Sequence, residues 1–138
     1  MKRALGVILA LGLVLGGSAA RWKPASIQGV WQVVEVNMEG RIVSNPQPAL
    51  VIFTPKYYSR TEVHAEGPRP NLTNGATASA DELRATWGPF HGEAGRYEIG
   101  GNRITLRPTV AKNPAAMMSG AYSVSSYELS GKTLTVST

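Results

Sequence analysis

Short strand-forming runs separated by turn signals are the feature that most constrains how this chain can fold. Runs rich in Val, Ile, Tyr and Thr cover residues 28–37, 41–43, 50–54, 57–64, 90–99, 103–107, 120–129 and 133–137. The run 50–54 is too short for a helix, and residues 103–107 alternate apolar and polar side chains as strands do. The pattern predicts about eight antiparallel strands, mostly linked by hairpins.

One segment after residue 20 is predicted to be helical. Ser79 and Glu82 have the spacing of a capping box, in which each residue satisfies a free amide of the other. Leu83 and Trp87 then share one face of a helix, and the Gly-Pro pair at 88–89 ends it. We expect a helix of about two turns in the middle of the strands.

Eight strands with this order avoid exposed edges by closing into one sheet. The predicted fold is therefore all-β, an antiparallel up-and-down eight-stranded barrel with one short helix. A barrel of this size is either filled by its own side chains or holds one small ligand. A β-sandwich is the alternative arrangement of the same strands.

The first twenty residues have the layout of a secretory signal peptide. A basic pair at 2–3 precedes an apolar run over 4–15, and small residues follow as far as Ala20. The run is shorter than the roughly 20 residues of a membrane-spanning helix, so we expect no stable membrane anchor after cleavage. The sequence predicts a signal peptide at 1–20 and one exported domain at 21–138, periplasmic or secreted and monomeric.

Composition excludes several classes of site. The chain has 138 residues and no cysteine, which rules out a disulfide framework, a thiolate zinc site, a cysteine nucleophile and a lipid-anchor cysteine. The formal charge of +5 falls to +3 once Lys2 and Arg3 are removed with the signal peptide. The remaining basic residues are scattered, so the sequence lacks the basic stripe of a nucleic-acid-binding protein.

Several motifs resemble those of the bacterial and fungal lipocalin-like domain family. Gly29-Val30-Trp31 looks like the Gly-x-Trp that starts a lipocalin barrel, and residues 32–35 continue that strand. Residues 51–58 are similar to the family's apolar strand, Thr-Pro turn and aromatic-rich strand. Further matches follow in the same order at Phe90, 95–98 and 127–135. The resemblance covers about residues 27–138 and implies a calycin-type barrel with an internal cavity, but no particular activity or catalytic set.

Trp31 and Glu35 lie on the same face of the first predicted strand. Trp31 either forms the floor of a ligand cup or plugs the closed end of the core. We favour the plug, stacked under Arg96 or Arg107. Glu35 is either a buried acid–base group with a raised pKa or a solvated residue at the open rim.

Two further groups of side chains have two interpretations each. Tyr58, Arg60, Glu62 and His64 share one strand face, which is either a polar wall inside the barrel or a solvated outer face. We favour the outer face. The apolar residues of the helix and the later loop form either a lid at the mouth or a cover on the barrel; they are Leu83, Trp87, Phe90, Met117, Met118 and Tyr122.

The sequence gives little support for a metal site or for hydrolytic catalysis. His64, His91 and Glu93 are possible metal ligands by type, but their spacing matches no known metal motif, so we predict no metal and no cofactor. The chain has no Gly-x-Ser-x-Gly elbow, and we predict no catalytic residues.

The sequence therefore predicts an exported barrel that binds a small, mostly hydrophobic molecule. The expected ligand-binding residues are Val33, Glu35, Phe53, Tyr58, Arg60, Trp87, Tyr97 and Tyr122. One alternative is an isomerase or cyclase that uses the same cavity, with Glu35, His64, His91 or Tyr97 transferring protons. Another is a filled barrel that acts through its surface on an envelope protein.

Overall fold

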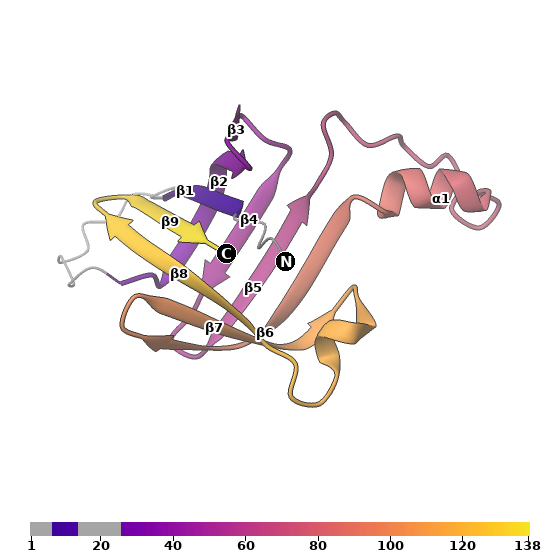
Figure 1. Cartoon of the computed structure of the whole chain (residues 1–138). Coiled ribbons are helices and arrows are strands. Elements are labelled where there is room, and N and C mark those ends of the chain that lie inside the picture. Colours follow the sequence, from indigo (N-terminus) through magenta and orange to yellow (C-terminus); the bar gives the residue numbers. More distant parts are fainter. Residues whose placement is uncertain (1–6, 14–25) are drawn as a thin grey trace.

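The computed structural model describes residues 7–13 and 26–138 (Figure 1). The described strands are β1 (Val7–Leu13), β2 (Gly29–Met38), β3 (Arg41–Ser44), β4 (Ala49–Phe53), β5 (Tyr57–Val63), β6 (Phe90–Gly100), β7 (Arg103–Ala111), β8 (Ser123–Ser130) and β9 (Thr133–Ser137). The helical elements are α1 (Ala80–Trp87) and the short 3-10 helix η1 (Pro114–Met117). The predicted signal peptide lies largely outside the described residues.

The strands form one curled antiparallel sheet. Their order is β1-β9-β8-β7-β6-β5-β4-β2-β3, and β1 also pairs with β2. Most strands therefore lie beside their neighbours in sequence, as hairpin-linked strands do. The expectation of a mostly antiparallel β fold with one α-helix is confirmed for the described residues. In Figure 1 the sheet curls into a half-barrel with a concave inner face.

Strands β3 and β4 share one position in the sheet. The first half of β2 pairs with β4, where Trp31 faces Val51, and the second half pairs with β3, where Val36 faces Val43. The break lies at residues 45–48, where two prolines remove backbone donors and Asn45 has a φ of 66°. The eight strands from β2 to β9 therefore occupy seven positions around the curl, not the eight that we expected.

Strand β1 occupies the remaining position. Leu9 pairs with Val36 of β2 on one side and with Val136 of β9 on the other. The backbone ring is thus completed by residues that the sequence assigns to the signal peptide. In this structure β1 lies between β2 and β9 and pairs with both. Residues 26–138 alone therefore leave a gap in the ring at this position.

The helix α1 begins as its capping box predicts. The Ser79 amide donates to Glu82 Oε2 at 2.7 Å, and the Glu82 amide donates to Ser79 Oγ at 3.2 Å. No residue of α1 is buried, and the helix stands to one side of the sheet (Figure 1). Its last residue, Trp87, packs edge-on against Phe90 at the start of β6. No helix among the described residues has the length and hydropathy needed to cross a membrane.

The core lies on the concave face, where alternate residues of each strand point inward. The fully buried apolar residues are Ile27, Trp31, Val33, Val51, Phe53, Tyr58, Ile104, Leu106 and Leu134. Trp31 is 2% exposed, and its indole Nε1 donates to the Ile27 carbonyl at 2.6 Å. Its place in the core agrees with the plug that we favoured. The expected cation above it is wrong, because Arg96 and Arg107 lie over Tyr57 and Tyr122 instead.

Candidate functional site

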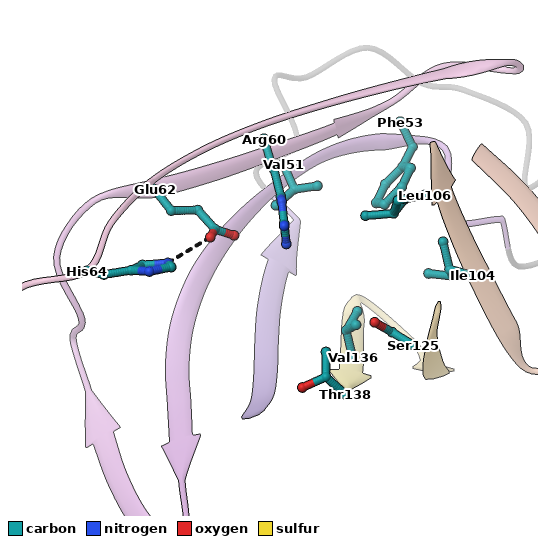
Figure 2. Close-up of a pocket in the computed structure, with 10 residues that line it drawn as sticks. All are labelled: Val51, Phe53, Arg60, Glu62, His64, Ile104, Leu106, Ser125, Val136 and Thr138. Atoms are coloured by element: carbon teal, nitrogen blue, oxygen red, sulfur yellow. Dashed lines mark hydrogen bonds and ion pairs between the residues drawn. The ribbon is translucent and has the colours of Figure 1, made fainter. Parts of the chain in front are cut away.

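A cavity of about 200 Å³ opens on the concave face (Figure 2). It is lined by Val51, Phe53, Arg60, Glu62, His64, Ile104, Leu106, Ser125, Val136 and Thr138. The apolar side chains come from β4, β7 and β9, and Phe53, Ile104 and Leu106 lie on the side away from Glu62 and His64 (Figure 2). The charged and imidazole side chains come from β5 and the residue after it and form what we call the polar end. The cavity is therefore amphipathic, with mainly apolar walls and charged groups concentrated on β5.

The polar end exists because β5 turns its charged face inward. In the sheet, Arg60 pairs with Val51 of β4 and Glu93 of β6, while Glu62 pairs with His91. The outward placement that we favoured from the sequence is therefore wrong. Alternation places these residues on one face but does not say which face, and inside the barrel each buried charge has a partner that offsets its desolvation.

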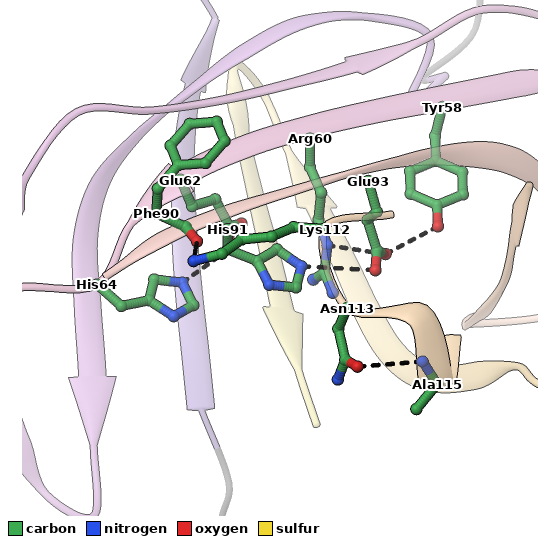
Figure 3. Close-up of polar contacts among 10 residues, drawn as sticks. All are labelled: Tyr58, Arg60, Glu62, His64, Phe90, His91, Glu93, Lys112, Asn113 and Ala115. Atoms are coloured by element: carbon green, nitrogen blue, oxygen red, sulfur yellow. Dashed lines mark hydrogen bonds and ion pairs between the residues drawn. The ribbon is translucent and has the colours of Figure 1, made fainter. Parts of the chain in front are cut away.

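Glu93 is the centre of the buried polar cluster (Figure 3). The Tyr58 hydroxyl donates to Glu93 Oε1 at 2.8 Å, and Arg60 Nε lies 3.0 Å from the same oxygen. His91 Nε2 lies 3.5 Å from the other carboxylate oxygen. The Arg60 and His91 nitrogens are buried but lack hydrogen-bond geometry, so they contact Glu93 through charge and proximity. This carboxylate therefore holds three side chains in place.

Glu62 and His64 form a second pair beside the first. His64 Nε2 lies 2.8 Å from Glu62 Oε2, and the His64 ring stacks on the His91 ring with centroids 5.7 Å apart. Burial of Glu62 raises its pKa, but the His64 hydrogen bond and the Arg60 charge together lower the pKa below its usual value. A carboxylate only accepts hydrogen bonds, so His64 donates to Glu62 through Nε2.

Burial and charge also set the protonation of two neighbours. Burial, followed by the nearby Arg60 guanidinium, lowers the pKa of His91 below its usual value, so the ring is neutral at pH 7. Burial and the hydrogen bond to Glu93 raise the pKa of Tyr58 well above its usual value. The cluster holds two carboxylates, Glu62 and Glu93, for the one guanidinium of Arg60.

The expected ligand-binding residues fall into three places. Phe53 and Arg60 line the cavity. Val33 and Tyr58 are buried core residues next to it, and Tyr97 packs edge-on against Phe53 at 5.1 Å. The remaining three lie outside this cavity: Glu35 half-buried on β2, Trp87 exposed at the end of α1, and Tyr122 exposed after η1.

Some lining residues were absent from the expected set. Ile104 and Leu106 are the inward pair of the alternating run at 103–107, and that alternation is the signal that identifies them. Glu93 faces Arg60 across β5 and β6, a relation that depends on strand register and is invisible in a single sequence. Ser125 and Val136 lie on neighbouring C-terminal strands with weaker patterns.

Among the described residues, no group of three or more His, Asp or Glu side chains is arranged to hold a metal ion. No protein-family model matches this chain, and searches of curated proteins and of solved structures find no significant match.

Proposed function

We propose that this chain is an exported lipocalin-like barrel that binds one small, mostly apolar and uncharged molecule in the concave cavity. The observation that carries the proposal is a cavity with mainly apolar walls whose charged groups are concentrated on β5. Apolar walls supply affinity, and a few convergent polar groups orient a ligand. The antiparallel strand order and the signal-peptide pattern support the barrel family and the export.

The cavity volume limits the size of the ligand. An apolar protein cavity of roughly 150 Å³ holds a benzene molecule. The cavity of about 200 Å³ therefore fits a single ring with one or two substituents, or a short branched chain. A fatty acid or sterol is too large unless the barrel opens.

The charge at the polar end limits the chemistry of the ligand. A ligand carboxylate placed beside Arg60 also lies near Glu62 and Glu93, which already compensate that guanidinium. Adding a third carboxylate beside two carboxylates that share one guanidinium is unfavourable in a partly desolvated site. A hydroxyl or carbonyl group instead accepts from the terminal Arg60 nitrogens without adding charge.

The test combines native mass spectrometry with calorimetry. The chain, expressed with its first twenty residues and purified gently, is expected to carry a mass that denaturation releases. Calorimetric titration with p-cresol and with 4-methylbenzoate compares a neutral and an anionic ligand on the same ring. We expect p-cresol to bind at least about tenfold more tightly, a difference of about 1.4 kcal/mol. Tighter binding of the benzoate contradicts the proposed selectivity.

A matched pair of variants separates the cavity from the rest of the barrel. Val136→Phe fills the apolar end of the cavity, while Val34→Phe makes the same change on the exposed outer face of β2. We expect p-cresol binding to be lost only in Val136→Phe. Absence of both a native adduct and p-cresol binding at millimolar concentration overturns the proposal and favours action through the surface.

A second candidate function is proton transfer to a bound carbonyl compound, as in an isomerase or cyclase. The observation that favours it is the His64–Glu62 pair, in which a buried carboxylate orients an imidazole at the cavity. Such pairs serve as general bases, because the carboxylate fixes the tautomer and stabilises the protonated ring. Nδ1 of His64 is the group that would take the proton.

The proton-transfer candidate has its own test. Exchange of the α-protons of cyclopentanone with deuterated water is followed by NMR with and without the protein. We expect His64→Gln to abolish the protein-dependent exchange, while its circular dichroism spectrum stays that of the folded chain. Tyr57→Phe is the control, since Tyr57 is exposed on the outer face of β5 and does not line the cavity. Exchange that survives His64→Gln contradicts this role.

A further inference from the structure

The turn around η1 presents apolar side chains to solvent far from the cavity walls. It leaves the end of β7 and projects away from the sheet (orange in Figure 1). Four large apolar side chains between residues 110 and 122 are exposed: Val110 by 60%, Met117 by 42%, Met118 by 69% and Tyr122 by 61%. Val110 belongs to β7, whereas Met117, Met118 and Tyr122 follow one another closely in the segment beyond it. Single exposed apolar residues are ordinary, but such a group on one projecting segment is typical of an interaction site.

The projecting turn is held in shape by its own hydrogen bonds. The Asn113 side chain accepts from the Ala115 amide at 3.1 Å, and the Ala121 amide donates to the Met118 carbonyl at 2.9 Å. At the base, Lys112 Nζ donates to the Gly88 and Phe90 carbonyls. The apolar tip is therefore preformed.

Two arginines lie on the sheet near Tyr122, where the turn returns to it. Residues 99–127 contain three basic residues and no acidic one. The Arg107 guanidinium lies 5.3 Å from the centre of the Tyr122 ring, and its β6 neighbour Arg96 lies 5.5 Å from the Tyr57 ring. The Glu98 carboxylate lies 3.4 Å from Arg107 Nε and partly compensates the charge of that guanidinium. Arg96 has no carboxylate partner among the described residues.

An arginine beside an exposed tyrosine suits the boundary between lipid and water. The tyrosine ring enters the interface while its hydroxyl stays hydrated, and the arginine reaches the phosphates. Basic residues near an anionic leaflet add affinity that salt weakens. A single projecting turn is also small beside the roughly 800 Å² that each partner gives to a stable protein interface. A bilayer, in contrast, accepts a few side chains at a time.

We infer that the η1 turn docks the protein reversibly on an anionic lipid bilayer. Met117, Met118 and Tyr122 enter the headgroup region, and Arg96 and Arg107 contact the lipid phosphates. The docking does not depend on the cavity being occupied, so it stands apart from the proposed ligand binding.

The absence of cysteine makes the test specific, because one introduced cysteine is the only labelling site. Met118→Cys and, as control, Ile42→Cys on exposed β3 are each labelled in the full chain with the environment-sensitive dye NBD. The probe surfaces are vesicles of equimolar phosphatidylcholine and phosphatidylglycerol, or of phosphatidylcholine alone. We expect the dye at 118 to brighten several-fold and shift to shorter wavelength only with the anionic vesicles, and the dye at 42 to stay unchanged.

Charge is tested in the same assay. Raising the salt from about 50 mM to about 500 mM shortens the screening length and is expected to reverse the signal at 118. Arg96→Gln combined with Arg107→Gln is expected to weaken vesicle affinity by about tenfold. The circular dichroism spectrum of each variant checks that the fold is retained.

Three results overturn the inference. An equal response at 42 and 118 places the contact elsewhere, for example on the apolar N-terminal run. No response at 118 with anionic vesicles excludes docking by this turn. A signal at 118 that rises with protein concentration without lipid shows instead that the turn mediates self-association.

Discussion

The imidazole rings of His64 and His91 lie almost parallel, with 3° between their planes and 5.7 Å between their centroids. Each ring also faces a buried carboxylate, Glu62 for the first and Glu93 for the second. Two basic groups that stack so closely repel each other when both are protonated, and the guanidinium of Arg60 adds a third charge. Burial and the Arg60 charge together hold the pKa of His91 below its usual value.

The first prediction is that acid weakens the fold through His91. Its pKa in the fold is below the usual value of 6.5, so between the two values the unfolded chain binds the proton and the fold does not. Stability is thus fully present above about pH 6.5 and is lost as the pH falls through the folded pKa. Thermal unfolding between pH 7.5 and 5 is expected to show a falling Tm.

His91→Asn is expected to flatten that pH dependence, because the titrating group is absent. The lowered pKa of Glu62 acts at lower pH, with stability present above its usual value of 4.5 and lost as the pH falls through its folded pKa. The two effects are therefore separated by pH. If the Tm of His91→Asn falls between pH 6.5 and 5 as steeply as that of the unmodified chain, another titrating group causes the pH dependence.

The second prediction concerns the Tyr58 hydroxyl. Tyr58→Phe removes a buried hydrogen bond to a carboxylate and is expected to cost about 1.5–3 kcal/mol of unfolding free energy. The raised pKa of Tyr58 adds an alkaline effect, since stability is present below its usual value of 10 and is lost as the pH rises above it. Urea denaturation at neutral pH measures the cost of losing the hydrogen bond, and urea denaturation above pH 10 measures the alkaline loss of stability.

Tyr57→Phe is the matched control on the outer face of β5, because Tyr57 is exposed and its ring contact with Arg96 does not use the hydroxyl. We expect a change below about 0.5 kcal/mol there. Equal losses in the two variants would mean that the Tyr58–Glu93 hydrogen bond contributes little.

The third prediction separates charge from shape at Glu93. Glu93→Gln leaves the Arg60 guanidinium without its carboxylate, which is expected to cost about 2–3 kcal/mol, at the low end for a broken buried pair because Arg60 is partly exposed. Adding Arg60→Met removes the unpaired charge and is expected to restore part of the loss. A double-mutant cycle by urea denaturation gives the coupling energy. Additive losses would contradict a direct interaction.

The fourth prediction follows from the place of β1 between the two edges of the sheet. A chain of residues 21–138 lacks this strand, so amides of β2 and β9 are expected to exchange with solvent faster than in the full chain. Amides of β5 and β6, which pair with each other, serve as the internal control. Equal protection of β9 in both chains would show that β2 and β9 pair directly once β1 is gone.

Local sequence signals predicted the elements well. The capping box placed α1 within a residue of its start, and the alternation over residues 103–107 agrees with the burial of Ile104 and Leu106 on one face. These features depend only on neighbours in the chain. The face that β5 buries could not be predicted, because its two faces are both rich in polar groups, and the choice rests on partners in other strands.

The sequence also did not allow us to predict that β3 and β4 share one position in the sheet. The prolines at 46 and 48 indicated a break in the chain of strand residues. Such a break either ends one strand or interrupts a strand that continues at the same position in the sheet. Only the pairing of both β3 and β4 with β2 shows that the second case holds here. Trp87 and Tyr122 were expected at the cavity because they are aromatic. Their positions at the ends of a helix and a loop left them free to point elsewhere.

The interrupted strand gives the wall two parts that need not unfold together. The β4 part contains Val51 and Phe53, which are buried in the core. The β3 part has no buried residue and pairs with β2 through four residue pairs. Segments with few buried contacts open at a small fraction of the global unfolding free energy. The β3 part can therefore open locally while the β4 part and the core stay folded.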